Sequence, residues 1–295
     1  MLKQLNRTMY LFLAGWMLVA CSQENVVPEA TNQKVGSQDV LYNAVATQDN
    51  NLAMGNPSGA GTSYSNYLVT KPQFVMSYNS YRGTPNWVSW HLSSAWLGST
   101  PRQDDFRADN SLPSNFYKVT HTDYTGSGFD RGHNCPSADR TLTVADNSAT
   151  FLMSNMIPQA PNNNQKTWAN LENYCRTLVS QGNELYVIMG SYGTGGDGSA
   201  GYKTTIAAGK VTVPNRIWKV IVVLPNGSGD AARVTTSTRV IAIDTPNSNT
   251  INTNWGTYRT TVDAIEAQMG YNLLSNVSSS VQAVIEAQVD TGPTQ

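Results

Sequence analysis

Cysteine, histidine and charge are all scarce in this sequence. Three of its 295 residues are cysteines, three are histidines, and charged residues make up 13%. So few cysteines exclude a disulfide-dense small scaffold and a four-cysteine zinc site. With 19 basic and 20 acidic residues the net charge is −1, so no overall field attracts the chain to nucleic acid or anionic lipid. A site for a polyanion must therefore be local.

Several common catalytic motifs are also missing. The sequence has no Gly-x-Ser-x-Gly elbow of a serine hydrolase, no His-Glu-x-x-His of a zinc protease, and no internal repeat. Residues 196–204 nearly match a phosphate-binding loop, but Tyr202 separates the last glycine from Lys203. We expect this segment to be a long hairpin connection.

The N-terminus has the pattern of a targeting segment. Lys3 and Arg7 precede an apolar run over residues 9–20, which is too short to span a membrane permanently but suits the core of a signal peptide. The run ends in Leu-Val-Ala-Cys21, which resembles the bacterial lipoprotein box. We expect residues 1–20 to be a signal peptide and a lipid on Cys21 to anchor the protein to the bacterial cell envelope, at the outer membrane. The alternative is an ordinary secretory signal, with release from the cell.

Residues 21–63 are rich in Asn, Gln, Ser, Gly and Ala and show no sustained period, which predicts a flexible tether. We expect the folded domain to span residues 64–290.

Short β-like runs separated by Gly, Pro or Asn recur in this domain, at 74–78, 87–92, 185–189, 211–213 and 218–224. Apolar residues at helical spacing predict helices at 167–179, at 257–269 with Gly270 as C-cap, and at 281–289. Because strands and helices do not alternate regularly, we expect an α+β fold with a largely antiparallel central sheet flanked by helices.

His133 is the histidine best placed for catalysis, because His91 lies in an alternating aromatic run and His121 precedes a turn. It closes the tetrapeptide Asp-Arg-Gly-His at 130–133. Further blocks follow at 136–140, 154–159, 164–165 and 168–172, with matches also at 86–88 and 255–258. In order and spacing these blocks resemble the DNA/RNA non-specific endonucleases, whose ββα-metal site carries this signature.

The resemblance implies a metal-dependent enzyme that hydrolyses phosphodiester bonds of DNA and RNA with little sequence preference. His133 takes the place of the general base, a role that an imidazole with an ordinary pKa of about 6.5 can perform. Asn164 takes the place of the single direct metal ligand. A lone amide oxygen suits Mg²⁺, which keeps several waters, although Mn²⁺ or another divalent cation is an alternative.

Glu172 takes the place of the family's second metal-associated residue. It follows Asn164 by eight residues, a rise of about 12 Å on a continuous helix, so both cannot ligate one ion directly. Glu172 therefore acts through metal-bound water, or Asn164 bends back before the helix begins.

Three arginines, Arg102, Arg131 and Arg140, are candidates to clamp phosphate oxygens, a task that suits the guanidinium group. Arg107 is an alternative to Arg102 as the upstream arginine. Asn155 either orients the site through hydrogen bonds or forms a turn.

Two other functions remain open from the sequence. Seven Trp and 14 Tyr on a tethered, loop-rich domain are also compatible with a non-catalytic surface lipoprotein that binds nucleic acid or polysaccharide. The same site could instead act on small nucleotides as a phosphodiesterase.

Once Cys21 is assigned to lipid, Cys135 and Cys175 remain. Each lies close in sequence to a proposed site residue, His133 or Glu172. Because exported proteins meet an oxidising environment, we expect a Cys135–Cys175 disulfide, with two free buried thiols as the alternative.

Overall fold

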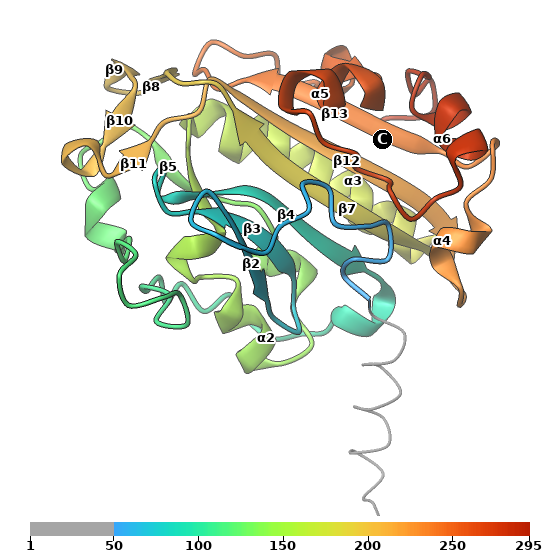
Figure 1. Ribbon diagram of the computed structural model, residues 1–295, viewed down its shortest axis with the longest axis horizontal. Helices are drawn as coiled ribbons and strands as arrows, with labels where there is room; N and C mark the ends of the chain where they lie inside the picture. The colour runs from blue at the N-terminus through green and yellow to red at the C-terminus, as the bar shows by residue number, and fades with distance from the viewer. Residues whose placement is uncertain (1–49) are drawn as a thin grey trace, which may run out of the picture.

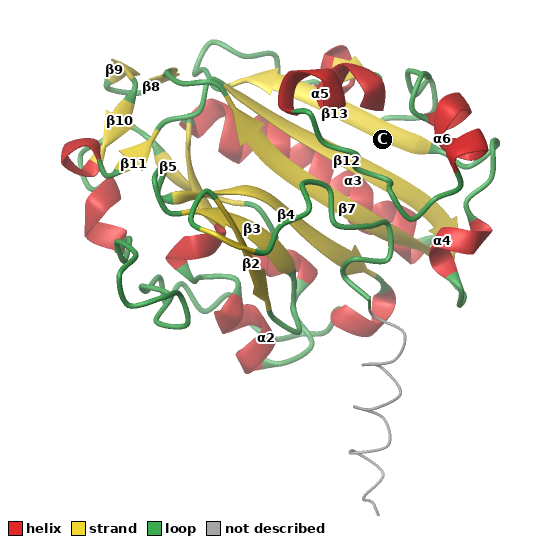
Figure 2. Ribbon diagram, viewed as in Figure 1, coloured by secondary structure: helices red, strands yellow, loops and turns green. Residues whose placement is uncertain are grey.

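A computed structural model describes residues 50–295 of the chain. Its centre is an eight-stranded antiparallel sheet, shown in Figures 1 and 2. In spatial order the strands are β1 (Thr62–Ser63), β2 (Asn66–Thr70), β3 (Val75–Asn79), β4 (Thr84–Leu92), β7 (Asn183–Tyr192), β12 (Arg216–Pro225), β13 (Val240–Pro246) and β14 (Arg259–Thr260). The expected α+β fold with a largely antiparallel sheet is confirmed.

The remaining strands form three small antiparallel pairs: β5 (Asp130–His133) with β6 (Met156–Gln159), β8 (Gly196–Gly198) with β9 (Gly201–Lys203), and β10 (Thr205–Ile206) with β11 (Val211–Thr212). The α-helices are α2 (Val144–Ala149), α3 (Ala169–Ser180), α4 (Asp230–Arg233), α5 (Val262–Met269) and α6 (Ser279–Ile285). Short 3₁₀ turns and one π-helix, η5 (Asn163–Trp168), connect these elements.

The central strands are buried on both faces of the sheet. In β12, Ile217 and Ile221 belong to one apolar core, while Trp218 and Val220 belong to the other. Because successive side chains of a strand point to opposite faces, a strand covered on both sides is apolar along nearly its whole length. This explains why the β12 run was recognisable in the sequence.

The two faces of the sheet are covered by different parts of the chain. Helix α3 packs on one face through Leu171, Tyr174 and Leu178. The C-terminal segment packs on the other face through residues that include Val262, Ile265 and Leu273. In Figure 1, α3 lies behind the sheet and α5 in front of it. We call these the α3 face and the C-terminal face.

The predicted strands all overlap observed ones, namely β3, β4, β7, β11 and β12. The helix predicted at 257–269 begins only at Val262, because Arg259 and Thr260 pair with β13 as an additional strand. Gly270 caps it in the left-handed conformation, at φ 67°, as expected. Strand β13 was not predicted, although its Val-Ile-Ala-Ile run is a strand signal. The segment that nearly matches a phosphate loop forms the β8–β9 hairpin.

The tether prediction for residues 21–63 extends too far. Met54 is 1% exposed and Ala60 is buried, so the packed domain already includes this stretch. Its polar residues make local hydrogen bonds: the Asn56 side chain bonds both the N–H and the carbonyl of Ala60. The folded part therefore starts well before the predicted boundary at 64. A polar composition indicated a tether here because these bonds are invisible to a hydropathy pattern.

The predicted signal peptide at 1–20, Cys21 and the rest of the tether up to residue 49 lie outside the described residues. Within residues 50–295, no helix has the length and apolar character needed to cross a membrane.

Candidate active site

The Asp-Arg-Gly-His tetrapeptide forms strand β5 of a ββα unit. β5 pairs with β6 so that Asp130 lies opposite Gln159 and His133 opposite Met156. After β6 the chain enters η5, which runs directly into α3. The expected ββα arrangement is therefore present, with its two strands joined by a long insertion that contains α2.

Gly132 allows the two strands of this unit to approach each other closely. A Cβ atom at this position would lie only 2.6 Å from Cβ of Gln159. No side chain fits there unless β6 moves. The glycine of the tetrapeptide is thus a packing requirement.

A cavity of about 350 Å³ lies beside β5 and the start of η5. Charged, amide and aromatic side chains line it: Arg102, Asp104, Phe106, His121, Tyr124, Thr125, Phe129, Asp130, Arg131, Asn164 and Gln165. It thus joins three of the predicted site residues, Arg102, Arg131 and Asn164.

His133 lies against an aromatic wall of this cavity. Its ring meets Phe106 and Phe151 edge-on, with centroids 5.6 and 5.0 Å away. Burial, together with the positive charges of Arg102 and Arg131, lowers the pKa of His133 to about 3. Its Nε2 is buried and has no hydrogen-bond partner among the described residues. The ring is therefore neutral at neutral pH, with a nitrogen that lacks the partner a buried polar atom normally has.

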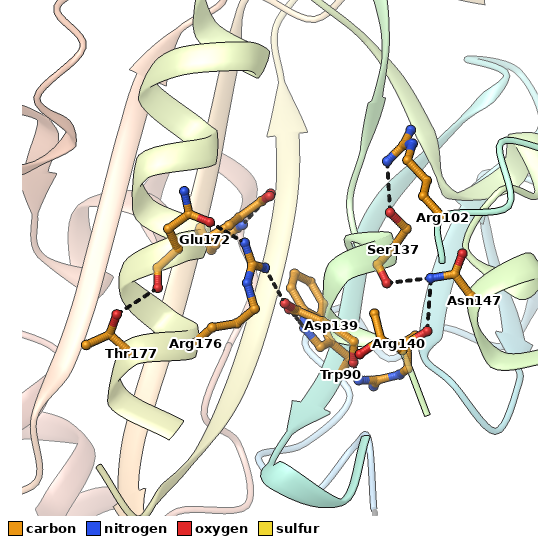
Figure 3. Close-up of polar contacts among 12 residues, drawn as sticks. Trp90, Arg102, Ser137, Asp139, Arg140, Asn147, Glu172, Arg176 and Thr177 are labelled. Atoms are coloured by element: carbon orange, nitrogen blue, oxygen red, sulfur yellow. Dashed lines mark hydrogen bonds and ion pairs between the residues drawn. The ribbon is translucent and has the colours of Figure 1, made fainter. Parts of the chain in front are cut away.

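Arg102 and Arg131 are positioned by the same aromatic cluster. The guanidinium carbon of Arg131 lies 4.1 Å from the ring centroid of Phe106, and that of Arg102 lies 4.7 Å from the ring centroid of Phe151. Arg102 also donates a 2.8 Å hydrogen bond to Oγ of Ser137, as Figure 3 shows. Two cations thus border the cavity, each stacked on a ring that also touches His133.

Arg107 does not reach the cavity. Its guanidinium donates to the carboxylate of Asp105 at 2.7 Å and to the carbonyl of Ser148 at 2.9 Å. Of the two upstream candidates, the structure places Arg102 at the cavity.

Arg140 was wrongly predicted to contact phosphate. It is fully buried, and its guanidinium donates to the backbone carbonyls of Gln73, His91 and Asp139 at 2.6–3.0 Å. It also stacks on Trp96 at 4.1 Å. Figure 3 shows Arg140 among residues of the interior. Because its donors are already used within the core, this arginine is a structural cross-link.

Asn164 is oriented by a carboxylate that the sequence did not single out. The amide nitrogens of Asn164 and Gln165 each donate a 2.8 Å hydrogen bond to Oδ2 of Asp130. A carboxylate accepts only from the NH₂ side of an amide, so the amide oxygens point away from Asp130. The pair of bonds therefore fixes which atom of Asn164 is free to bind a ligand.

This oxygen set fits a hard divalent cation. Asn164 and Gln165 line the cavity and carry amide oxygens that Asp130 does not engage, and Mg²⁺ takes such neutral oxygen ligands while keeping several waters. The guanidinium groups of Arg102 and Arg131 line the same cavity, and each can pair with an oxygen of a phosphodiester. The site thus has room for a cation on one side and for an anion beside the guanidinium groups.

Glu172 lies further along α3 and does not line the cavity. Its carboxylate is 3.5 Å from Nζ of Lys219, a fully buried lysine of β12. Nζ also lies 5.4 and 4.9 Å from the ring centroids of Trp90 and Trp168. Burial raises the pKa of Glu172, and Lys219 counteracts this rise. Because η5 and α3 are continuous, Asn164 does not bend back, which leaves action through water as the role open to Glu172.

Asp139 links the same helix to β4. It accepts hydrogen bonds from Arg176 of α3 at 2.7 Å and from the indole nitrogen of Trp90 at 3.0 Å, as Figure 3 shows. The carboxylate is buried and fully paired. Asp139 therefore holds α3 against β4, whose Trp90 ring lies beside Lys219.

Asn155 is buried away from the cavity. Its side chain accepts from the N–H of Cys135 and donates to the carbonyls of Cys135 and Thr150. Cys135 lies two residues after His133, so these bonds hold the end of β5 beside the start of β6.

The predicted disulfide between Cys135 and Cys175 is wrong. Both cysteines are free and buried in the core of the α3 face. Burial raises the pKa of each thiol to about 12, so the thiolate that disulfide chemistry requires is scarce. The two residues therefore pack as small apolar side chains.

The cavity residues to which the sequence analysis gave no role include Asp130, Gln165 and His121. The first two stand inside blocks that carry the family resemblance, which was the available signal. His121 was expected to be structural, yet it is exposed and lines the cavity. Only the folded chain brings it to the site.

The model of the family described as DNA/RNA non-specific endonuclease matches residues 54–280. A protein described as a nuclease from Nostoc sp. is 50% identical over 242 residues, which cover 81% of this chain and 85% of that protein. Nuclease C1 of Cunninghamella echinulata is 34% identical over 56% of this chain and 68% of its own length.

More distant relatives have the same fold. Human mitochondrial endonuclease G is 34% identical over 52% of this chain and 54% of its own length. A crystal structure of an EndoG/EndoGI complex matches with a TM-score of 0.62 and 26% identity, covering 77% of this chain and 91% of the other. The large antiparallel sheet with its flanking helices agrees with this structural match. The chain belongs to the DNA/RNA non-specific endonuclease family, and it is a nuclease.

Proposed function

We propose that the chain hydrolyses phosphodiester bonds of DNA and RNA in the cavity beside β5, with Mg²⁺ as its cofactor. One observation carries this proposal: a single cavity is lined by two guanidinium groups and by the Asp130–Asn164–Gln165 oxygen set, and it adjoins a buried neutral histidine. These supply an anion site, a cation site and a base at one cavity. Hydrolysis of a phosphodiester needs all three.

His133 is the general base of the proposed reaction. The unpartnered Nε2 accepts the proton of the attacking water. With a pKa of about 3 the free imidazole is a weak base. A phosphate bound to Arg102 and Arg131 neutralises the two cations that help to lower this pKa, so substrate binding strengthens the base. Proton acceptance is thereby coupled to the presence of the substrate.

Arg102 and Arg131 bind and orient the phosphate. Guanidinium groups pair with phosphate oxygens through two parallel hydrogen bonds, and they stabilise the extra negative charge of the transition state. Stacking on Phe106 and Phe151 restricts both side chains before substrate arrives. Such preorganisation lowers the entropic cost of binding.

Asn164 holds the cation through its amide oxygen, in the orientation set by Asp130. When bound, Mg²⁺ supplies positive charge beside the reacting phosphate and a source of acidic water for the leaving oxygen. Glu172 acts through a water molecule, and Lys219, 3.5 Å away, counteracts the rise in its pKa that burial causes. Asn155 positions the end of β5. None of these groups reads a base, which accounts for low sequence preference.

Degradation of plasmid DNA and of RNA with and without EDTA tests this function. Both substrates should be cut in Mg²⁺ and protected in EDTA. A protein that binds both but cuts neither would be a binding module, and one that cuts only small diesters would be a nucleotide phosphodiesterase. Replacing Mg²⁺ with Mn²⁺ in the same assay tests the choice of metal.

We also propose that Cys21 carries lipid and holds the domain at a bacterial outer membrane. The support is the box that ends in this cysteine after a basic and apolar leader. The wild type should partition into the detergent phase and Cys21→Ala should not. Equal partitioning of both proteins would refute the anchor.

A further inference from the structure

Three carboxylates gather on the C-terminal face, far in the fold from the ββα unit. Asp263 and Glu266 stand one turn apart on α5, and Glu286 caps the C-terminus of α6. One oxygen of each side chain lies within 4.8 Å of the other two. The N–H of Asp263 also donates to the carbonyl of Glu286 at 3.1 Å, which fixes the two helix ends to each other.

Glu286 is the unusual member of this group. The residue is 6% exposed, and its Oε1 is buried with no hydrogen-bond partner among the described residues. One oxygen of the Glu286 side chain lies within the cluster, and Oε1 has no donor among the described residues.

Other carboxylates of the C-terminal segment show how such a charge is normally compensated. Asp290, four residues on, pairs with Arg239 at 2.7 Å and with Arg259 at 3.2 Å. Glu286 has no such ion pair among the described residues, and its neighbours in the cluster are carboxylates. A buried, unpaired carboxylate is costly unless something positive neutralises it.

The geometry of the cluster suits a metal ion. Ca²⁺ binds carboxylate oxygens at about 2.3 to 2.6 Å, so two ligands on opposite sides of one ion are at most about 5.2 Å apart. The separations of up to 4.8 Å among the three oxygens fall within this limit. One oxygen of Glu266 already accepts from the N–H of Leu273 at 2.6 Å, which leaves its other oxygen for the ion.

We infer that Asp263, Glu266 and Glu286 form a binding site for a hard divalent cation, Ca²⁺, which is separate from the active site. Ca²⁺ accepts irregular geometry and completes its shell with water, whereas Mg²⁺ demands a near-ideal octahedron that ligands from two short helices rarely provide. The ion neutralises the buried Glu286 carboxylate and joins α5 to α6.

The site stabilises the packing of the α5–α6 segment against the first described residues of the domain. The loop between α5 and α6 buries Leu273 and Leu274 in the core of the C-terminal face. In the same loop, Asn276 bonds the carbonyls of Leu52 and Ala53, where the described chain begins. A cation at the helix ends therefore holds the segment that closes over the start of the domain.

A thermal-unfolding experiment on EDTA-treated full-length protein tests this inference, with Ca²⁺ alone as the probe. The wild type should gain about 3 to 11 °C in Tm at 10 mM Ca²⁺, as expected for a site with a Kd of about 10⁻⁴ to 10⁻³ M. Glu286→Gln should lose this gain and, without calcium, be at least as stable as the wild type. Asp263→Asn, at an exposed position, should lose the gain without endangering the fold.

Asp197→Asn is the matched control, because it removes a negative charge outside the cluster. It should keep the full calcium response. All three variants should cut DNA at the wild-type rate in Mg²⁺. Absence of a calcium response in the wild type would overturn the site, and so would a full response in both Glu286→Gln and Asp263→Asn.

Discussion

The Lys219 ammonium and the Glu286 carboxylate are buried on opposite faces of the sheet, and they differ in what neutralises them. Lys219, on the α3 face, contacts Glu172 and the rings of Trp90 and Trp168. Glu286, on the C-terminal face, has only carboxylates beside it. The charge of Lys219 is thus paired within the chain, whereas Glu286 has no cation beside it among the described residues.

This difference also divides the roles of the two faces. On the α3 face, the buried Lys219 lies beside α3 of the catalytic unit and pairs with Glu172. On the C-terminal face, the buried Glu286 lies where the ends of α5 and α6 meet, in the segment that packs over the start of the domain. The comparison shows that a paired buried charge can position a catalytic side chain, whereas an unpaired buried charge can create a ligand site.

The largest expected effect is a loss of cleavage that leaves the calcium response of the C-terminal face unchanged. His133→Ala should lower the cleavage rate by about 10² to 10⁴-fold, the contribution of a general base, while the calcium-induced rise in Tm stays at the wild-type value. Asn164→Ala should lose cleavage and Mg²⁺ affinity together. Plasmid cleavage and Mg²⁺ titration calorimetry measure these effects. A His133→Ala enzyme that keeps more than about one hundredth of the rate would contradict the assignment.

The second prediction concerns the pairing of Lys219. Lys219→Met keeps most of the side-chain volume but leaves the partly buried Glu172 without its cation, and should cost about 2 to 4 kcal/mol of unfolding free energy. Adding Glu172→Gln should recover much of this loss, because no unpaired charge then remains. Urea unfolding of the four proteins in EDTA gives the coupling energy. If Lys219→Met alone lowers the unfolding free energy by less than about 0.5 kcal/mol, as is typical of a surface pair, the contrast with Glu286 is lost.

A smaller effect should distinguish the two upstream arginines. Arg102→Ala should lower kcat/KM by about 10 to 100-fold, because it removes a charge-assisted contact to phosphate. Arg107→Ala is the matched control and should stay within about twofold of the wild type, since this side chain points to Asp105. Equal losses in both variants would mean that the cavity is not where phosphate binds.

The smallest effect is a pH dependence of stability. The folded-state pKa of His133 is about 3, below the ordinary value of about 6.5 in the unfolded chain. Between these values the unfolded state binds a proton that the folded state does not, so stability falls as pH decreases from 6.5 towards 3. By pH 5 the wild type should lose about 1 to 2 kcal/mol relative to His133→Gln. Parallel pH profiles of the two proteins in EDTA would show that His133 is not buried in its neutral form.

The sequence by itself determined the architecture of the sheet and the position of the site. Strands β4, β7 and β12 are buried on both faces, so their local composition carries the signal. The Asp-Arg-Gly-His tetrapeptide and the blocks after it located the ββα unit, because chemistry requires fixed residue types at fixed spacing. Boundaries were less accurate: the polar turns at 50–63 resemble a tether in composition, although their amides are bonded within the domain.

Only the tertiary structure decided which role each of several residues of the same type has. Arg102 and Arg140 look alike in the sequence, but carbonyls of Gln73 and His91, 67 and 49 residues away, enclose Arg140 in the core. The fate of Cys135 and Cys175 was decided in the same way, by burial that the flanking residues do not reveal. Glu286 became a candidate ligand only because the chain folds α6 back against α5. The spacing of apolar side chains along a helix or strand predicts which of its faces is buried. The partner that a buried polar group meets depends instead on long-range packing.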